Sequence, residues 1–170
     1  MEILVLNASP LIHLTRTGLS KLFEELPFRF ITVQEVKVEA VDKGRKIEPA
    51  GSEIIEQLIR KGKIIIEKPT ETKVIELIAT SRSLHRGEVM VLALAKQKDY
   101  TAVIDDSKSR RVAKTLGIRF EGTPFLLASA VLAGTSSKGQ AAEALRELVK
   151  HGWRSGPLEF AQNAKKIQEF

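Results

Sequence analysis

The sequence contains no cysteine, and its 170 residues include three histidines, one tryptophan and one tyrosine. The lack of cysteine excludes disulfide bonds, thiolate metal sites and cysteine nucleophiles. The histidines, His13, His85 and His151, are scattered without the spacing of a zinc site, so we expect none of them to be a metal ligand. Any metal chemistry therefore has to rest on oxygen ligands.

Long apolar runs are also missing. No run approaches the roughly 20 residues that a membrane-spanning helix needs. The chain starts directly with a strand-like segment, without a basic region ahead of an apolar stretch, so we expect no signal peptide. These absences predict a cytoplasmic protein that does not interact with membranes.

Acidic residues are fewer than basic ones. The chain carries 21 Asp and Glu against 27 Lys and Arg, which gives a net charge of +6 and a pI near 9.6. This balance favours a polyanionic partner such as nucleic acid, although a solvated lysine-rich surface would produce the same charge. The length and the 43 % hydrophobic content are those of one folded domain, which we expect to span residues 1–170.

Short apolar runs alternate with helical patterns along the chain. The predicted strands are Ile3–Leu6, Phe28–Val33, Ile64–Ile66, Ala102–Ile104 and an edge strand Arg119–Glu121. The first predicted helix begins at Ser9 and Pro10. The helices predicted after it are Leu19–Leu26, Gln34–Val41, Ser52–Lys61, Thr70–Thr80, Glu88–Lys98, Ser107–Leu116 and Thr123–Ala133, with further helices in 136–170. The polar segment Lys43–Gly51 is expected to be a loop. The alternation indicates an α/β fold, a parallel sheet covered by helices on both faces.

Oxygen-bearing side chains stand where these elements begin or end. Asn7 follows the first strand, Asp105 and Asp106 follow the fourth, and Glu39 and Glu88 lie on helices between them. In an open α/β sheet, functional groups gather at the carboxyl ends of the strands. Carboxylate and amide oxygens that converge there would suit a hard divalent cation, Mg²⁺ or Mn²⁺.

Each of these residues also has a structural explanation. Asn7 is a common turn former, Glu88 opens a helix whose dipole it complements, and Glu39 precedes Lys43 in the favourable order for an ion pair. One of the two aspartates can cap the helix Ser107–Leu116, which leaves the other unexplained by capping. Adjacent side chains point apart, so we expect only one of them to face the site.

Basic residues accompany the acidic ones. Arg110, Arg111 and Lys114 share a face of the helix after Asp106, where they would contact phosphates or form a solvated surface. Ser9 would cap its helix as the N-cap residue or help to hold a phosphate at that helix end. The segment 134–139 lacks the spacing of a phosphate-binding loop and is expected to be a turn followed by a helix cap.

Four segments in this order resemble the PIN domain family: ILVLNASPLIHL, VQEVKVEAV, HRGEVMVLALA and AVIDDSKSRRVAKTLGI, which start at residues 3, 33, 85 and 102. The resemblance is strongest over residues 1–135. The segment GTPFLLASAVLAG that follows resembles a subgroup of predicted nucleic-acid-binding PIN proteins, which often open with Asn-Ala-Ser-Pro-Leu-Ile.

The resemblance implies a three-layer α/β/α fold with a central parallel sheet of about five strands. It also implies a Mg²⁺- or Mn²⁺-dependent ribonuclease, including the toxin of a toxin–antitoxin pair, with RNA, an antitoxin protein and a second copy of the chain as partners. The family's acidic residues map onto Asn7, Glu39, Glu88 and Asp105 or Asp106, and the metal would be held by Glu39, Glu88, Asp105 and Asp106. Asn7 departs from the family's aspartate and lowers the charge of the site.

Two further functions are open at this point. A metal site weakened at Asn7 would leave a PIN-fold module that binds nucleic acid or protein without cutting. The other is a nucleotide- or small-molecule-binding α/β protein. The lack of a glycine-rich first βα turn argues against this function.

Overall fold

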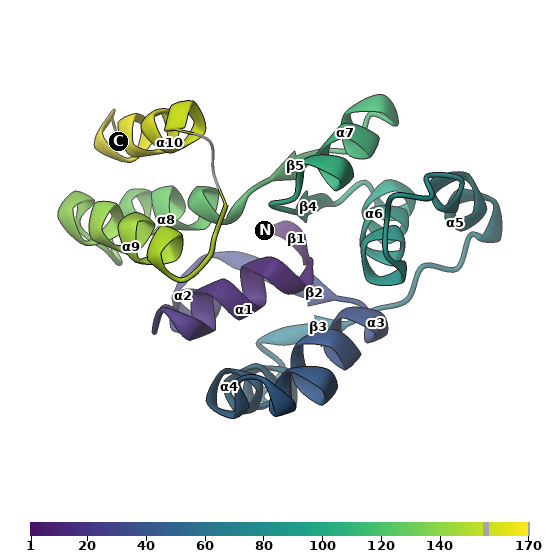
Figure 1. Ribbon diagram of the computed structural model, residues 1–170, viewed down its shortest axis with the longest axis horizontal. Helices are drawn as coiled ribbons and strands as arrows, with labels where there is room; N and C mark the ends of the chain where they lie inside the picture. Colours follow the sequence, from purple (N-terminus) through teal and green to yellow (C-terminus); the bar gives the residue numbers. More distant parts are fainter. Residues whose placement is uncertain (155–156, 170) are drawn as a thin grey trace.

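A five-stranded parallel sheet forms the centre of the molecule (Figure 1). The computed structural model describes residues 1–154 and 157–169. The strand order is β3-β2-β1-β4-β5, and every neighbouring pair is parallel. The strands are β1 (Glu2–Leu6), β2 (Phe28–Thr32), β3 (Ile64–Ile66), β4 (Thr101–Val103) and β5 (Phe120–Glu121). The three-layer α/β/α fold and the edge position of the fifth strand are therefore confirmed.

The strands are apolar on both sides because helices cover both faces of the sheet. Leu4, Val5 and Leu6 of β1 and all of β4 are buried. Right-handed crossovers place the helices that connect β1, β2 and β3 on one face and those that connect β3, β4 and β5 on the other. The first group is α1 (Ala8–Arg16), α2 (Leu22–Glu25), α3 (Gln34–Lys37) and α4 (Pro49–Arg60), and the second is α5 (Thr72–Ala79), α6 (Arg86–Lys98) and α7 (Ser107–Thr115).

Three more helices lie together beside the sheet in Figure 1. They are α8 (Thr123–Leu132), α9 (Lys138–Lys150) and α10 (Pro157–Glu169). Arg16 of α1 joins this group to the rest of the molecule, because it donates hydrogen bonds to the Glu48 carboxylate at 2.5 Å and to the His151 carbonyl at 3.2 Å. Of the expected range 136–170, Ser155, Gly156 and Phe170 lie outside the described residues.

Two local predictions were wrong. Ser9 does not cap α1, because the helix starts at Ala8 with Asn7 in the N-cap position, and Ser9 is its second residue. The predicted helix Gln34–Val41 and the loop after it are instead the short α3, a π-helix η1 (Val38–Lys43), a 3-10 turn η2 (Gly44–Lys46) and the first turn of α4, which begins at Pro49. The apolar residues in this segment, Ala40 and Val41, are buried and hold the irregular helix against the core.

The turn after α8 and the start of α9 agree with the prediction from the sequence. Gly134 has a positive φ of 71°, and Ser137 begins α9 with a capping box in which Gln140 takes part. The expected turn and helix cap over residues 134–139 are confirmed. None of the described helices combines the length and the apolar character that crossing a lipid bilayer requires.

Candidate active site at the carboxyl edge of the sheet

The carboxyl ends of β1 and β4 bring Asn7 and the two aspartates to one edge. The backbone N–H of Asn7 donates a hydrogen bond to the Val103 carbonyl at 3.1 Å, so the pairing of β1 with β4 continues to that point. The Asn7 side chain is 5 % exposed. Asp105 and Asp106 follow β4 directly and precede α7. The sheet therefore places three of the predicted residues next to one another.

Asp106 is the N-cap of α7, as predicted for one of the two aspartates. Its Oδ1 accepts a hydrogen bond from the Ser109 amide at 2.7 Å. Its Oδ2 is buried and finds no hydrogen-bond partner in the part of the chain that the structure describes. A buried carboxylate oxygen without a partner is costly unless a positive charge or a donor reaches it, so this atom is a natural point of attachment for a cation.

Glu88 lies in the first turn of α6, and its carboxylate accepts a hydrogen bond from the His85 amide at 2.7 Å. Burial raises the pKa of Glu88, and the nearby charges of Asp106 and Glu39 raise it further, while the His85 amide opposes the shift. Glu39 is exposed on η1. A Cβ added at Gly87 would lie 3.6 Å from Glu39 Oε2, which places Glu39 against the first turn of α6. We call Glu39, Glu88 and Asp106 the acidic cluster.

Asp105 points elsewhere and is not part of the acidic cluster. Its Oδ1 accepts a hydrogen bond from the Thr123 amide at 2.8 Å, and its Oδ2 accepts one from the Thr123 hydroxyl at 2.7 Å. Thr123 is the first residue of α8. Asp105 therefore satisfies the N-terminus of a second helix, which corrects the expectation that capping leaves one aspartate unexplained. We call Asp105, Arg110 and Thr123 the Asp105 clamp.

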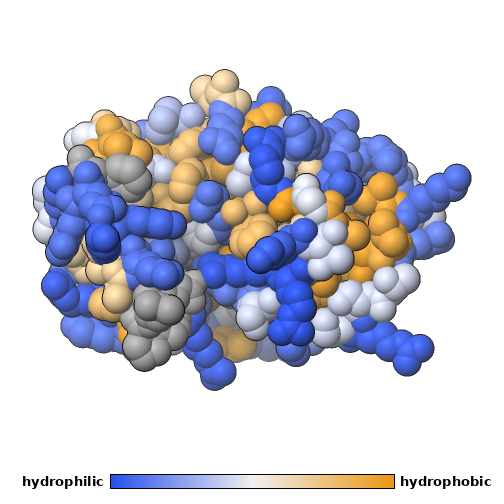
Figure 2. Space-filling model, turned by 90° about the horizontal axis from the view of Figure 1, so that it is seen from above, coloured by the Kyte–Doolittle hydropathy of each residue, from blue (hydrophilic) through white to orange (hydrophobic). Residues whose placement is uncertain are grey.

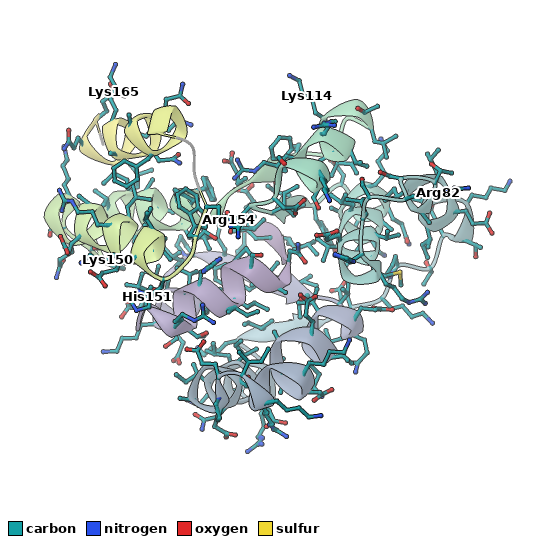
Figure 3. All side chains as sticks on the ribbon, viewed as in Figure 1. Arg82, Lys114, Lys150, His151, Arg154 and Lys165 are labelled. Carbon is teal, nitrogen blue, oxygen red and sulfur yellow. The ribbon has the colours of Figure 1, made fainter. Side chains whose placement is uncertain are left out.

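Arg110 completes this clamp and faces inward. It donates through Nε to the Ile104 carbonyl at 3.0 Å, and its Nη2 lies 3.8 Å from Asp105 Oδ1. Arg111 and Lys114 are exposed on the same helix, and Figure 3 shows Lys114 on the outer side of α7. Of the three basic residues predicted to share a face, two are thus open to solvent, while Arg110 binds the turn that carries the aspartates.

Two neighbours of the site carried no clear signal in the sequence. His13 of α1 is half-buried; burial lowers its pKa, while the charge of Asp105 acts in the opposite direction. Thr123 is fully buried, but in the sequence it stood only for the start of a helix.

Ser9 is half-buried in the first turn of α1. Glu35, Glu39 and Arg86 line an open groove of about 780 Å³ between η1 and α6, where Arg86 lies 3.5 Å from Glu35.

Residues 3–169 match a family model described as PIN domain. The chain belongs to the PIN domain family. PIN domains have a nuclease-type fold, generally depend on divalent metal ions and interact with nucleic acids. A comparison with curated proteins gave no match to this PIN domain chain.

The fit of a metal ion to this PIN domain depends on the placement of its acids. Among the residues that the structure describes, no three acidic or histidine side chains lie close enough to hold one ion together. The chemistry of the acidic cluster nevertheless fits a hard divalent cation. Its carboxylate oxygens are the preferred ligands of such ions, the Asp106 Oδ2 atom has no hydrogen-bond partner among the described residues, and burial together with the charges of Asp106 and Glu39 raises the pKa of Glu88.

Proposed function

We propose that this PIN domain protein is an endoribonuclease that depends on Mg²⁺ or Mn²⁺. The observation that carries the proposal is the buried Asp106 Oδ2 atom, which has no hydrogen-bond partner among the described residues and lies near Glu88, whose pKa is raised by burial and further by the charges of Asp106 and Glu39. Structural ion pairs relieve such repulsion, whereas an acidic nuclease site retains it until a cation binds. The proposal assigns metal binding to Glu39, Glu88 and Asp106, directly or through water.

A bound divalent ion would supply a water of lowered pKa and a positive charge for the phosphate oxygens. The chain's own residues hold the substrate around it. Asn7 and Ser9 stand at the start of α1, where an amide, a hydroxyl and the helix N-terminus orient a phosphate. Arg111 and Lys114 on α7 bind backbone phosphates on one side. The groove beside Glu39 accepts the strand on the other.

The surface is compatible with an extended polyanion. Hydrophilic side chains are spread over the face drawn in Figure 2, with apolar patches between them. Figure 3 labels exposed basic residues that are distributed over several elements, among them Arg82 before α6, Lys114 on α7 and Arg154 after α9. Spread charges of this kind provide sequence-independent affinity for a phosphate backbone that falls with salt.

The decisive experiment is an RNA cleavage assay with single-stranded RNA labelled at one end. We expect cleavage in the presence of Mn²⁺ or Mg²⁺, no cleavage in EDTA, and none by the Glu88→Gln variant. The matched control is Glu24→Gln, which changes an exposed glutamate of α2 far from the site in sequence. Equal cleavage by Glu88→Gln and wild type would reject the assignment of the site.

A second candidate is a PIN domain that binds RNA without cutting it. The neutral Asn7 and the lack of three closely spaced acids among the described residues favour this alternative. It predicts salt-dependent RNA binding that metal ions do not change, with no cleavage product at any Mn²⁺ concentration. The same assay, combined with a binding measurement by fluorescence anisotropy, separates the two functions.

The proposal extends to the role of a toxin that an antitoxin protein neutralises in the cytoplasm, and to a homodimer. Leu132 of α8 and Val149 of α9 are exposed apolar residues that would suit a second copy. Expression of the wild type should then arrest growth, whereas Asp106→Asn should not. Normal growth at equal protein levels of both would contradict the toxin role without touching the nuclease activity.

A further inference from the structure

We propose that Asp105 is a positioning residue, which fixes the turn that carries Asp106, and that it does not itself bind the metal. The proposal rests on the nuclease site proposed above. It reassigns one of two adjacent aspartates that the sequence could not tell apart. Its evidence is the set of contacts that surrounds the Asp105 carboxylate.

Both oxygens of the Asp105 carboxylate are already engaged within the protein. Both oxygens accept hydrogen bonds from Thr123, at 2.8 Å from its amide and at 2.7 Å from its hydroxyl. The Asp105 side chain is only 8 % exposed, and the Arg110 guanidinium lies 3.8 Å from its Oδ1 atom. A carboxylate with two donors and a positive charge beside it has little to gain from a further cation. This contrasts with Asp106, whose Oδ2 atom has no hydrogen-bond partner within residues 1–154 and 157–169.

Gly122 leaves the space that Arg110 and Asp105 occupy in the clamp. A Cβ at Gly122 would overlap the Arg110 guanidinium and would lie 3.3 Å from Asp105 Oδ1. The φ of Gly122 is −111°, which any residue can adopt. The backbone therefore does not require glycine here, and the side chain is absent where Arg110 and Asp105 need room.

The clamp acts on Asp106 through the shared turn. Arg110 donates to the Ile104 carbonyl at 3.0 Å, on one side of the two aspartates, and the Ser109 amide donates to Asp106 Oδ1 at 2.7 Å, on the other. Asp105 joins this turn to the first residue of α8. The turn is thus held at both ends, which fixes the direction in which Asp106 presents its free oxygen. Groups that orient metal-binding side chains in this way commonly change metal affinity when removed.

Two variants weaken the clamp and leave the acidic cluster intact. Thr123→Val removes the hydroxyl with little change of shape, and Gly122→Ala displaces Arg110. We expect each to raise the Mn²⁺ dissociation constant about tenfold in calorimetric titration, as is typical of groups that orient metal ligands. Thr123→Ser should restore the wild-type value. Thr115→Val is the matched control, because the hydroxyl of that exposed threonine donates to the Arg111 carbonyl within its own helix α7.

Asp105→Asn and its combination with Thr123→Val distinguish positioning from direct binding. A positioning role predicts that the double variant binds Mn²⁺ no more weakly than the worse single variant, since both changes open the same clamp. Loss of all Mn²⁺ binding in Asp105→Asn, with wild-type affinity in Thr123→Val and Gly122→Ala, would show that Asp105 is a ligand and would overturn the proposal.

A measurement without metal keeps this inference separate from the proposed function. The Ser109 amide bonds to Asp106, so its hydrogen exchange reports whether Asp106 stays in place. We expect faster Ser109 exchange in Thr123→Val and Gly122→Ala than in Thr115→Val. If the wild type binds no Mn²⁺, the nuclease proposal fails, and this exchange alone decides the role of Asp105: faster exchange upholds it, and unchanged exchange overturns it.

Discussion

The acidic cluster and the Asp105 clamp lie side by side at the same edge of the sheet, yet they treat charge in opposite ways. In the clamp, the carboxylate of Asp105 has hydrogen-bond donors and an arginine beside it. In the cluster, burial and neighbouring acids raise the pKa of Glu88, and no described residue donates a hydrogen bond to Asp106 Oδ2. A satisfied charge stabilises a fold, whereas an unsatisfied one is a candidate for binding.

The largest expected effect separates the two aspartates by activity. Asp106→Asn should lower RNA cleavage by at least about 100-fold, because it removes a metal-binding charge, while asparagine still caps α7. Its melting temperature should stay close to that of the wild type. Asp99→Asn is the matched control, since the Asp99 side chain is 92 % exposed. Undiminished cleavage by Asp106→Asn would erase the distinction between the two regions.

Asn7→Asp tests whether the Asn7 side chain faces the acidic cluster. A fourth carboxylate facing the acidic cluster should tighten Mn²⁺ binding about tenfold, since charges in a partly buried site are weakly screened. It should also lower the melting temperature of the metal-free protein through repulsion. Calorimetric titration and thermal melting of one variant give both values. Weaker Mn²⁺ binding would place Asn7 away from the cluster.

The basic residues of α7 should divide in the same way. Lys114→Ala and Arg111→Ala remove exposed charges, so each should weaken RNA binding a few-fold and reduce the salt dependence of log K by about one. Fluorescence anisotropy between low and moderate salt measures this slope. Arg110→Ala should instead lower the melting temperature, because it removes bonds of the clamp. An Arg110→Ala variant that changes only RNA affinity would contradict its assignment to the clamp.

The smallest effect concerns stability and pH. The raised pKa of Glu88 means that its ionised form is disfavoured in the folded protein, so the cost is present at neutral pH and disappears below the ordinary value of about 4.5. Glu88→Gln should therefore raise the melting temperature of the metal-free protein at pH 7, by about 1 °C because the half-exposed group is screened. This gain should vanish at pH 4. Glu76→Gln serves as control, and a gain that persists at pH 4 would reject electrostatic relief.

Much of the fold could be predicted because its strands are short, continuous apolar runs separated by turn residues. The strand Ile64–Ile66 has the predicted bounds, and one of the two aspartates before the polar helix caps it, as expected. Helix ends were harder to locate. Ser9 and Asn7 are both good N-cap residues. The helix that forms starts two residues earlier than predicted, at Ala8, directly after the Asn7 N–H that continues the pairing of β1 with β4.

The clamp could not be predicted because it depends on tertiary structure. Asp105 and Thr123 are 18 positions apart, and no local pattern states that one bonds to the other. The π-helix was equally hidden, since its buried Ala40 and Val41 fit an ordinary helix in the sequence. Asn7 follows β1 and the two aspartates follow β4, as the sequence predicted, but only the contacts showed which carboxylates are already satisfied.

The position of β1 in the middle of the sheet has a consequence for synthesis on the ribosome. β1 pairs with β2, which ends at Thr32, and with β4, which ends at Val103. At about 5–20 residues per second, the intervening 71 residues (103 − 32) take roughly 4–14 s to be made. During that interval one edge of an apolar strand has no partner. The nascent chain therefore passes through a stage in which the open edge of β1 favours pairing with other chains. The yield of folded protein should then depend more on the supply of chaperones than on the stability of the folded state.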